Sequence, residues 1–334
     1  MKNKDNKGNK KKKCIVKKIF LIILAVLLVW LAADIIVTEI YARKIPHRFA
    51  SAEEGRELML SNTEYYSAMT QIDIEARLGR SGATLDELLD ASTAEVKSFN
   101  IIEKYLLDRR IAHMARTLSR NGYELPQLEE IVYIKTDMTT EGIGASGYTH
   151  GTQIYLNSIN VLISAIPGGS EYFEQLLWHE LFHCLTRNNP DFRAEMYSLI
   201  DFTVTGTDFE FPPCIRDVYC SNPDVEHHDA YATFNIDGQD IDCYLVWIYL
   251  PGELGSAPDL PVLVPIDGTD TYYLPEQASD FFEVFGTNAD YYIDPEEFMA
   301  DNFKYAMYYG IEGQGGEGYP EPEIIQGIID IMSR

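Results

Sequence analysis

The longest apolar run of the chain lies near its beginning. Residues 19–37 read IFLIILAVLLVWLAADIIV, and the first fifteen of them are all apolar. A helix needs about this length to cross a hydrocarbon core of roughly 30 Å. Asp34 falls near one end of the run, where lipid headgroups would lie. We therefore predict a transmembrane signal-anchor helix over residues 19–38, through which the chain contacts a lipid bilayer.

A cleaved signal peptide would also contain an apolar run. Cleavage after Ala33 would place Leu31 at the third position before the cut, and cleavage after Ala32 would place Trp30 there. Neither residue is small, as signal peptide cleavage requires. The sequence therefore favours an uncleaved anchor.

After the anchor, the spacing of apolar residues becomes that of amphipathic helices. Residues 39–51 are expected to form a short stalk. Residues 52–125 are expected to be mainly helical, because apolar residues recur there three or four positions apart. These apolar residues are Leu85, Leu88, Leu89, Val96, Phe99, Ile102 and Leu106.

The periodicity changes again after residue 126. Residues 130–136, EIVYIKT, predict a strand, and residues 149–157, THGTQIYLN, alternate as in a half-buried strand at an edge or inside a sheet. The sequence AYATFNIDGQDIDCYLVWIYL predicts a hairpin, because its Asp237-Gly238 pair suits a two-residue turn. We interpret residues 126–334 as one domain that contains a strand-rich insert at 205–280.

Helices are also predicted in this domain. One follows residues 168–170, with Ser170 as its N-cap, and runs to about Arg187. Asn189-Pro190 begins another, since proline is tolerated at the first helical position. Asp294-Pro295 begins a third, which ends at Gly310, and EIIQGIIDIM predicts an amphipathic helix at the end of the chain. We predict a fold of the α+β class for these strands and helices.

Charge divides the chain into two parts. Nine lysines and one aspartate give residues 1–18 a net charge of +8, so the total of −25 leaves −33 for the remainder. The positive-inside rule places this basic tail in the cytoplasm. We therefore expect a single-pass protein of the cell membrane whose acidic domain is extracellular. Phosphates would be repelled by that domain, so nucleic acid is not an expected partner.

Two further patterns have structural alternatives. Cys14 belongs to the basic tail, whereas Cys214 and Cys220 could close a short disulfide loop on the oxidising side of the membrane. Cys184 is expected to pack as a small buried hydrophobic residue. Glycines at 142, 144 and 147 form a G-x-G-x-x-G pattern, but a strand-like sequence follows it instead of the helix that a dinucleotide site needs.

Two histidines lie four residues apart in the otherwise apolar sequence LLWHELFHCL, residues 176–185. On a helix, His179 and His183 share one face, and two neutral imidazoles can bind one Zn²⁺. Glu180 is rotated about 100° from His179, so it can face a metal-activated water without binding the metal. The pattern matches the H-E-x-x-H signature of metalloproteases. The alternative is a pair of hydrogen-bonded core histidines.

A catalytic zinc needs a third protein ligand and an open position. The metzincin pattern would place a histidine six residues after His183, where this chain has Asn189. The other histidines lie in the stalk, the helical region, a strand and the insert. A carboxylate is therefore the better candidate.

The sequence YYIDPEEFMADNF, residues 291–303, supplies such a carboxylate. Glu297 and Asp301 are four residues apart on one helix face. We expect Glu297 to bind the metal and Asp301 to accept the second ring N–H of a ligating histidine, His179 in our interpretation. Glu296 is rotated about 100° away and is expected to be exposed. The alternative is an ordinary acidic face of a helix.

HELFH followed by EEFMADNF resembles the gluzincin metallopeptidases, and most of all the anthrax lethal factor and Pro-Pro endopeptidase group. The resemblance covers about residues 130–334, and the two helices carry nearly all of it. It implies a zincin-like fold, with a twisted sheet, an active-site helix below the edge strand and a mostly helical C-terminal half. It also implies one Zn²⁺ bound by His179, His183 and Glu297, Glu180 as general base, and a peptide or protein substrate that adds to a sheet edge.

The chain departs from part of this family in the group that would stabilise the oxyanion. Thermolysin-like members use a histidine after the third ligand, but no histidine follows His228 here. Lethal-factor-like members use a tyrosine shortly before the glutamate ligand. Tyr291 and Tyr292 lie one or two residues closer to Glu297 than that spacing, and Tyr291 is favoured. Packing is the alternative role, since the chain has 22 tyrosines.

The predicted function is that of a membrane-anchored, extracytoplasmic zinc endopeptidase. One alternative is a non-catalytic binding or scaffold module tethered to the membrane on the same fold. Another is hydrolysis of a non-protein amide of the cell envelope. Residues 45–120 could have an inhibitory or a structural role.

Overall fold

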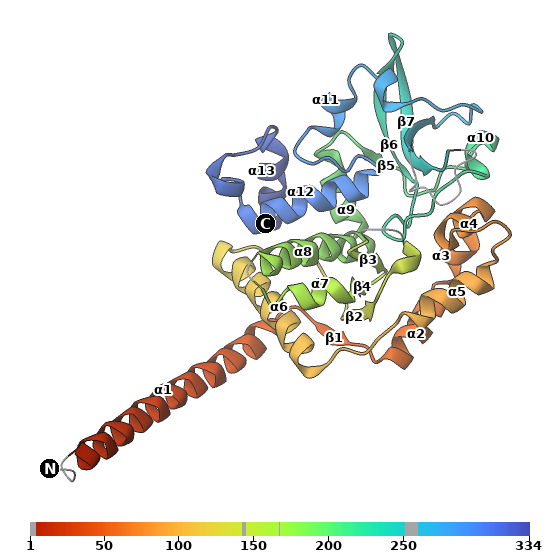
Figure 1. Ribbon diagram of the computed structural model, residues 1–334. Coiled ribbons are helices and arrows are strands. Elements are labelled where there is room, and N and C mark those ends of the chain that lie inside the picture. Colours follow the sequence, from red (N-terminus) through yellow and green to blue (C-terminus); the bar gives the residue numbers. More distant parts are fainter. Residues whose placement is uncertain (1–4, 142–144, 167, 251–259) are drawn as a thin grey trace.

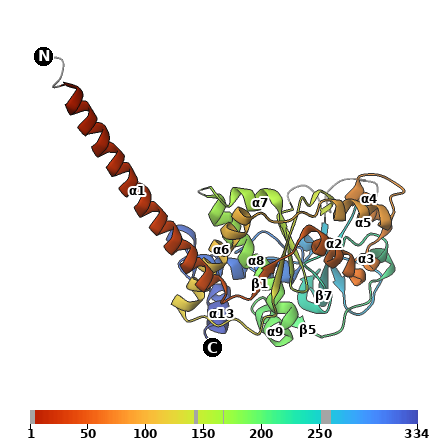
Figure 2. The same cartoon turned by 90° about the horizontal axis from the view of Figure 1, so that it is seen from below.

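The computed structural model describes residues 5–141, 145–166, 168–250 and 260–334, with side chains from residue 15 onward. Gly142 and Gly144 of the glycine pattern and the side chain of Cys14 lie outside the described part. Helix α1 (Asp5–Ala42) projects from the body of the protein (Figures 1 and 2). Within the described residues, α1 alone is long and apolar enough to cross a membrane, over Ile15–Ala42.

The end of α1 is fixed to helix α6 (Ile101–Asn121). Tyr105 donates a hydrogen bond to Asp34, and Arg109 Nε lies 3.6 Å from the same carboxylate. Residues 39–51, expected as a stalk, instead contain the end of α1 and strand β1 (His47–Phe49). Ile45 beside this strand is 1% exposed, so apolar burial draws the segment into the fold.

The first sheet has the strand order β1-β2-β4-β3. Strand β2 (Ile131–Thr136) confirms the strand predicted at 130–136 and is parallel to β1 and to β4 (Gln153–Asn157). Strand β3 (Gly147–His150) is antiparallel to β4 and forms the edge. The single strand predicted over 149–157 is therefore wrong. Gly151, with φ +56°, starts a turn that divides it into a hairpin.

Strand β2 is buried along its whole length, because helices cover both faces of this sheet. Ile131 and Tyr133 face a core shared with α6 and α8 (Gly169–Asn188), whereas Val132 and Ile134 face the N-terminal helices. The N-terminal helices are α2 (Ala52–Ser61), α3 (Thr63–Ala68), α4 (Gln71–Leu78) and α5 (Leu85–Ala94). Helix α7 (Ser158–Ile163) joins β4 to α8.

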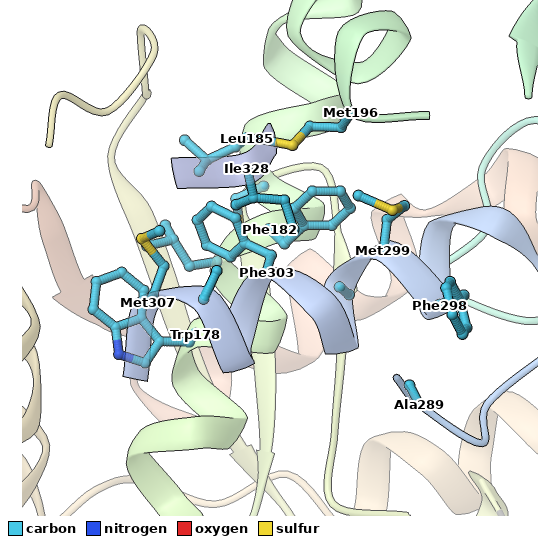
Figure 3. Packing of buried hydrophobic residues seen from close by; sticks show 14 of the residues in the cluster. Trp178, Phe182, Leu185, Met196, Ala289, Phe298, Met299, Phe303, Met307 and Ile328 are labelled. Atoms are coloured by element: carbon cyan, nitrogen blue, oxygen red, sulfur yellow. The ribbon is translucent and has the colours of Figure 1, made fainter. Parts of the chain in front are cut away.

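Helix α8 packs against α9 (Pro190–Ser198) and α12 (Pro295–Tyr309), and α12 in turn packs against α13 (Pro322–Met332). These three helices confirm the helices predicted from Asn189-Pro190, Asp294-Pro295 and EIIQGIIDIM. The predicted N-cap of α8 is wrong by two residues, because Gly168 occupies that position. Figure 3 shows Trp178 and Phe182 of α8 packed beside Phe303 of α12. The Phe182 and Phe303 ring centroids are 5.3 Å apart.

The strand-rich insert forms a second, antiparallel sheet in the order β5-β6-β7-β8. Its strands are β5 (Thr203–Val204), β6 (Ala230–Ile236), β7 (Gln239–Ile248) and β8 (Leu260–Pro265), accompanied by the short helices α10 (Pro213–Arg216) and α11 (Phe281–Phe285). The predicted hairpin is confirmed. Asp237 and Gly238 both have positive φ, as a two-residue hairpin turn requires.

The cysteines whose side chains the structure describes are all free thiols. The disulfide considered between Cys214 and Cys220 is therefore absent from this structure. Cys220 N donates a hydrogen bond to Trp247 O of β7, which fixes the position of Cys220. Cys214 lies in α10. Cys184 is fully buried among apolar residues of α8, as predicted.

Replacing Phe303 by alanine should lower the free energy of unfolding by about 3–5 kcal/mol, because a fully buried aromatic ring is lost and a cavity remains. Phe282→Ala is the matched control, since that ring is 57% exposed. Guanidinium unfolding of the full-length chain in detergent, followed by tryptophan fluorescence, measures the difference. Equal losses in the two variants would contradict the packing described for α8 and α12.

Candidate metal centre

The two histidines of α8 and one glutamate of α12 converge on one point. The His179 and His183 ring centroids are 4.8 Å apart. Glu297 Oε2 lies 3.1 Å from His179 Nε2 and 3.7 Å from His183 Nε2. Donor atoms bound to one tetrahedral Zn²⁺ at about 2.0–2.1 Å would be roughly 3.3 Å apart. The spacing of the three groups therefore fits a single ion of this size.

Each histidine also has its other ring nitrogen held by a carboxylate of α12. His179 Nδ1 lies 2.9 Å from Asp301 Oδ1, and His183 Nδ1 lies 2.9 Å from Glu296 Oε1. A proton on each Nδ1 donates to its carboxylate and leaves Nε2 with a free lone pair. Carboxylates in this position orient a metal-binding imidazole and raise its basicity. Asp301 lies where the sequence predicted it.

The expectation that Glu296 would be exposed is wrong. Its side chain is buried, and it accepts further hydrogen bonds from Thr186 Oγ1 at 2.6 Å and from the Tyr197 hydroxyl. The reason is that α12 is enclosed by α8 on one side and α9 on another. The Glu296 side chain, which is rotated about 100° from Glu297, therefore faces another helix and not solvent.

The protonation preferences of this cluster favour a positive charge at its centre. Burial alone would lower the pKa of His179, but hydrogen bonds to Asp301 and Glu297 outweigh burial and raise it well above its usual value. Burial would raise the pKa of Glu297, but the two histidines lower it. His183 Nε2 is buried and has no hydrogen-bond partner among the described residues. A divalent cation would satisfy this nitrogen and the neighbouring carboxylate together.

Glu180 lies beside this centre and is held by the edge strand. Its carboxylate is buried, and Oε2 accepts a 2.7 Å hydrogen bond from Thr149 Oγ1 of β3. Gly147 of the same strand makes room for it, since a Cβ there would lie 2.5 Å from Glu180 Oε1. Burial raises the pKa of Glu180 above its usual value, against the opposing effect of the histidines. Such a carboxylate is suited to accept a proton.

The structure separates the two candidate tyrosines. Burial, followed by the charges of Glu297 and Asp224, raises the pKa of Tyr291, so its hydroxyl stays protonated. Its ring is 38% exposed. Tyr292 instead stacks on Phe298 with ring centroids 5.3 Å apart, within an aromatic cluster. Of the pair, Tyr291 is the one whose pKa is raised by Glu297 and Asp224, whereas the pKa of Tyr292 is raised by burial, Asp290 and Glu321.

Two residues of the insert reach the centre, and sequence spacing does not reveal them. Asn222 Nδ2 donates a 2.6 Å hydrogen bond to Glu297 Oε1. Asp224 Oδ1 lies 3.9 Å from His183 Nε2. Both residues come from a turn without periodicity, so only the tertiary structure places them there.

Comparison with known proteins does not identify a relative: no family model matches the chain, and no curated protein or solved structure matches it either. The chemical interpretation of this centre therefore depends on its own residues.

We expect one zinc ion per full-length chain in detergent. Glu297→Ala should weaken zinc binding by about 100-fold or more, because it removes a proposed ligand. Glu296→Gln should weaken zinc binding by about 10-fold to 100-fold, because an amide orients the His183 ring less strongly than a carboxylate does. Glu312→Ala, on an exposed loop, is the control. Chelator competition measures the dissociation constants. Zinc affinity unchanged in Glu297→Ala would exclude the ligand set described above.

Proposed function

We propose that this chain is a membrane-anchored, zinc-dependent endopeptidase with its catalytic domain outside the cell. The observation that carries the proposal is the convergence of His179, His183 and Glu297 beside the buried carboxylate of Glu180. A bound Zn²⁺ would act as a Lewis acid that acidifies water and polarises a carbonyl oxygen. The chain's own residues would then supply the proton transfers and the alignment of the substrate.

Glu180 is the proposed general base. Thr149 donates to one oxygen of its carboxylate, which leaves the other oxygen to accept a proton from water in the site. The same carboxyl group can then return the proton to the leaving amine. Carboxylates on α12 hold the two imidazoles in one orientation during these steps, so proton transfer does not require them to move.

The edge strand β3 is the proposed binding element for substrate backbone. It lies against α8 and has one side without a strand of the first sheet. An extended peptide can add to such an edge through backbone hydrogen bonds. Thr149 belongs to this strand and also contacts Glu180, so a bound peptide would be aligned with the base. This arrangement supports a peptide or protein substrate over a non-protein amide.

The zincin-like fold and membership of the gluzincins belong to this proposal. Support comes from the sheet with an antiparallel edge strand, the HELFH helix beside it and a third ligand on a later helix. The lysine-rich start of the chain and the apolar α1 support a cytoplasmic N-terminus and an extracellular catalytic domain. A non-catalytic zinc-binding module on this fold is the alternative that the first experiment below distinguishes.

Glu180→Gln should retain zinc while cleavage of a peptide library falls by about 100-fold to 10,000-fold, because the amide cannot accept the proton. Glu171→Gln, an exposed position on the same helix, should cleave normally. Both variants are compared as full-length chains in detergent, with zinc measured per chain. One zinc per chain with equal cleavage by both variants would favour the binding module and contradict the endopeptidase proposal.

Tyr291→Phe should lower kcat about 100-fold with little change in KM, because a hydroxyl aimed at a developing oxyanion contributes on the order of 3 kcal/mol to the transition state. Tyr292→Phe should leave both constants nearly unchanged, since that ring packs among aromatic residues. Steady-state kinetics on the best library peptide separate the two variants. The opposite ranking would show that Tyr292 has the role assigned here to Tyr291.

A further inference from the structure

The loop segment Ser221–Glu226 of the insert lies over the metal centre and along the edge strand. Thr149 N donates a 2.7 Å hydrogen bond to Asp224 Oδ1, and Gly151 N donates a 2.9 Å hydrogen bond to Glu226 Oε1. The first of these amides belongs to β3 and the second to the turn after it, and each donates to a carboxylate of the segment. Two carboxylates of the segment therefore occupy donors that an extended peptide would need at this edge.

The same segment contacts the residues that would bind the metal. Asn222 donates to Glu297, and Asp224 Oδ1 lies 3.9 Å from the unpartnered His183 Nε2. One oxygen of Asp224, one of Glu180 and a ring nitrogen of His183 all lie within 4.8 Å of one another. Asp224 is 7% exposed. Its carboxylate thus lies beside the proposed base and one candidate ligand, in a group of donor atoms that shares His183 with the group of His179, His183 and Glu297.

Helix α8 holds the segment on one side through a buried guanidinium group. Arg187 Nη2 donates a 3.0 Å hydrogen bond to Pro223 O, and Arg187 Nε lies 3.1 Å from Glu226 Oε1. Since α8 also carries both histidines, this contact fixes the segment relative to the metal centre.

Helix α4 holds the segment on the other side through a buried ion pair. Asp73 and Arg77 are joined at 3.0 Å, with side chains that are 0% and 8% exposed. Arg77 Nη2 donates a 2.8 Å hydrogen bond to Ser221 O, and Ser221 Oγ donates to Asp73. The N-terminal helices therefore take part in placing Asp224.

We propose that Asp224 moves from its place beside His183 onto the ion at this centre as a fourth protein ligand, so that the Ser221–Glu226 segment keeps most resting molecules latent and only the fraction with a displaced segment cleaves peptide. The inference rests on the proposed function, because it needs an ion bound by His179, His183 and Glu297. Four protein ligands close a zinc site, whereas catalysis needs an open position. Activation then requires the segment to move, and the Asp73–Arg77 pair gives the N-terminal helices an inhibitory role.

The test replaces zinc with Co²⁺ in the full-length chain in detergent and follows the visible d–d absorption, which depends on the ligand set. Asp224→Ala and the nearly isosteric Asp224→Asn are compared with wild type and with Asp217→Asn, an exposed control in the insert. Acetohydroxamate is titrated as a probe of the open position. Peptide cleavage by the zinc forms is measured in parallel.

Both Asp224 variants should show a changed Co²⁺ spectrum and bind acetohydroxamate about tenfold more tightly or better, because the probe no longer competes with an intramolecular carboxylate. Cleavage should increase, whereas Asp217→Asn should match wild type. If Asp224→Ala fails to fold, Asp224→Asn decides, since its amide oxygen can still accept from Thr149.

Stoichiometric Co²⁺ with an unchanged spectrum and unchanged acetohydroxamate affinity in the variants would overturn the inference and leave the proposed function intact. Lower cleavage by the Asp224 variants would also overturn it. If even the wild-type chain binds no Co²⁺ and no zinc, both the inference and the proposed function fail.

Discussion

The candidate centre depends on two hydrogen bonds between buried carboxylates of α12 and imidazoles of α8. Asp301 holds His179 and Glu296 holds His183, each at 2.9 Å. Buried charges are costly unless they are paired and hydrogen-bonded, and these pairs satisfy that requirement across a helix interface. The surrounding apolar packing, with Phe182 against Phe303, keeps the two helices at the separation that the pairs need. The orientation of the two rings, the spacing of the candidate ligands and the position of Glu297 all follow from this interface.

Three parts of the chain that are distant in sequence meet around that interface. The first sheet contributes Thr149 on its edge, the insert contributes Asn222, and helix α4 holds the insert through Asp73. A change in any of these parts therefore acts on the same few atoms. Through Asp73, the N-terminal helices help to position residues of the candidate centre, a role that their own sequence does not indicate.

The sequence predicted the elements whose signals are local. Four-residue spacing placed His179 with His183 and Glu297 with Asp301, and proline or Asp-Gly signals located two helices and a hairpin. It did not predict what depends on neighbours distant in sequence. Glu296 is buried because α9 covers the face that would otherwise be solvent. Asn222 and Asp224 lie in a turn without periodicity, and Gly151 divides an alternating run that resembles one strand.

The attachment of α1 to α6 has a consequence for what the protein could reach. Asp34 near the end of the apolar run is bonded by α6, and the chain enters strand β1 a few residues after α1 ends. No flexible tether separates the two. If α1 lies in a bilayer, the body is held at a constant height and orientation above the lipid. The protein could then act only on targets at that height above the membrane. Targets farther from the membrane would be out of its reach.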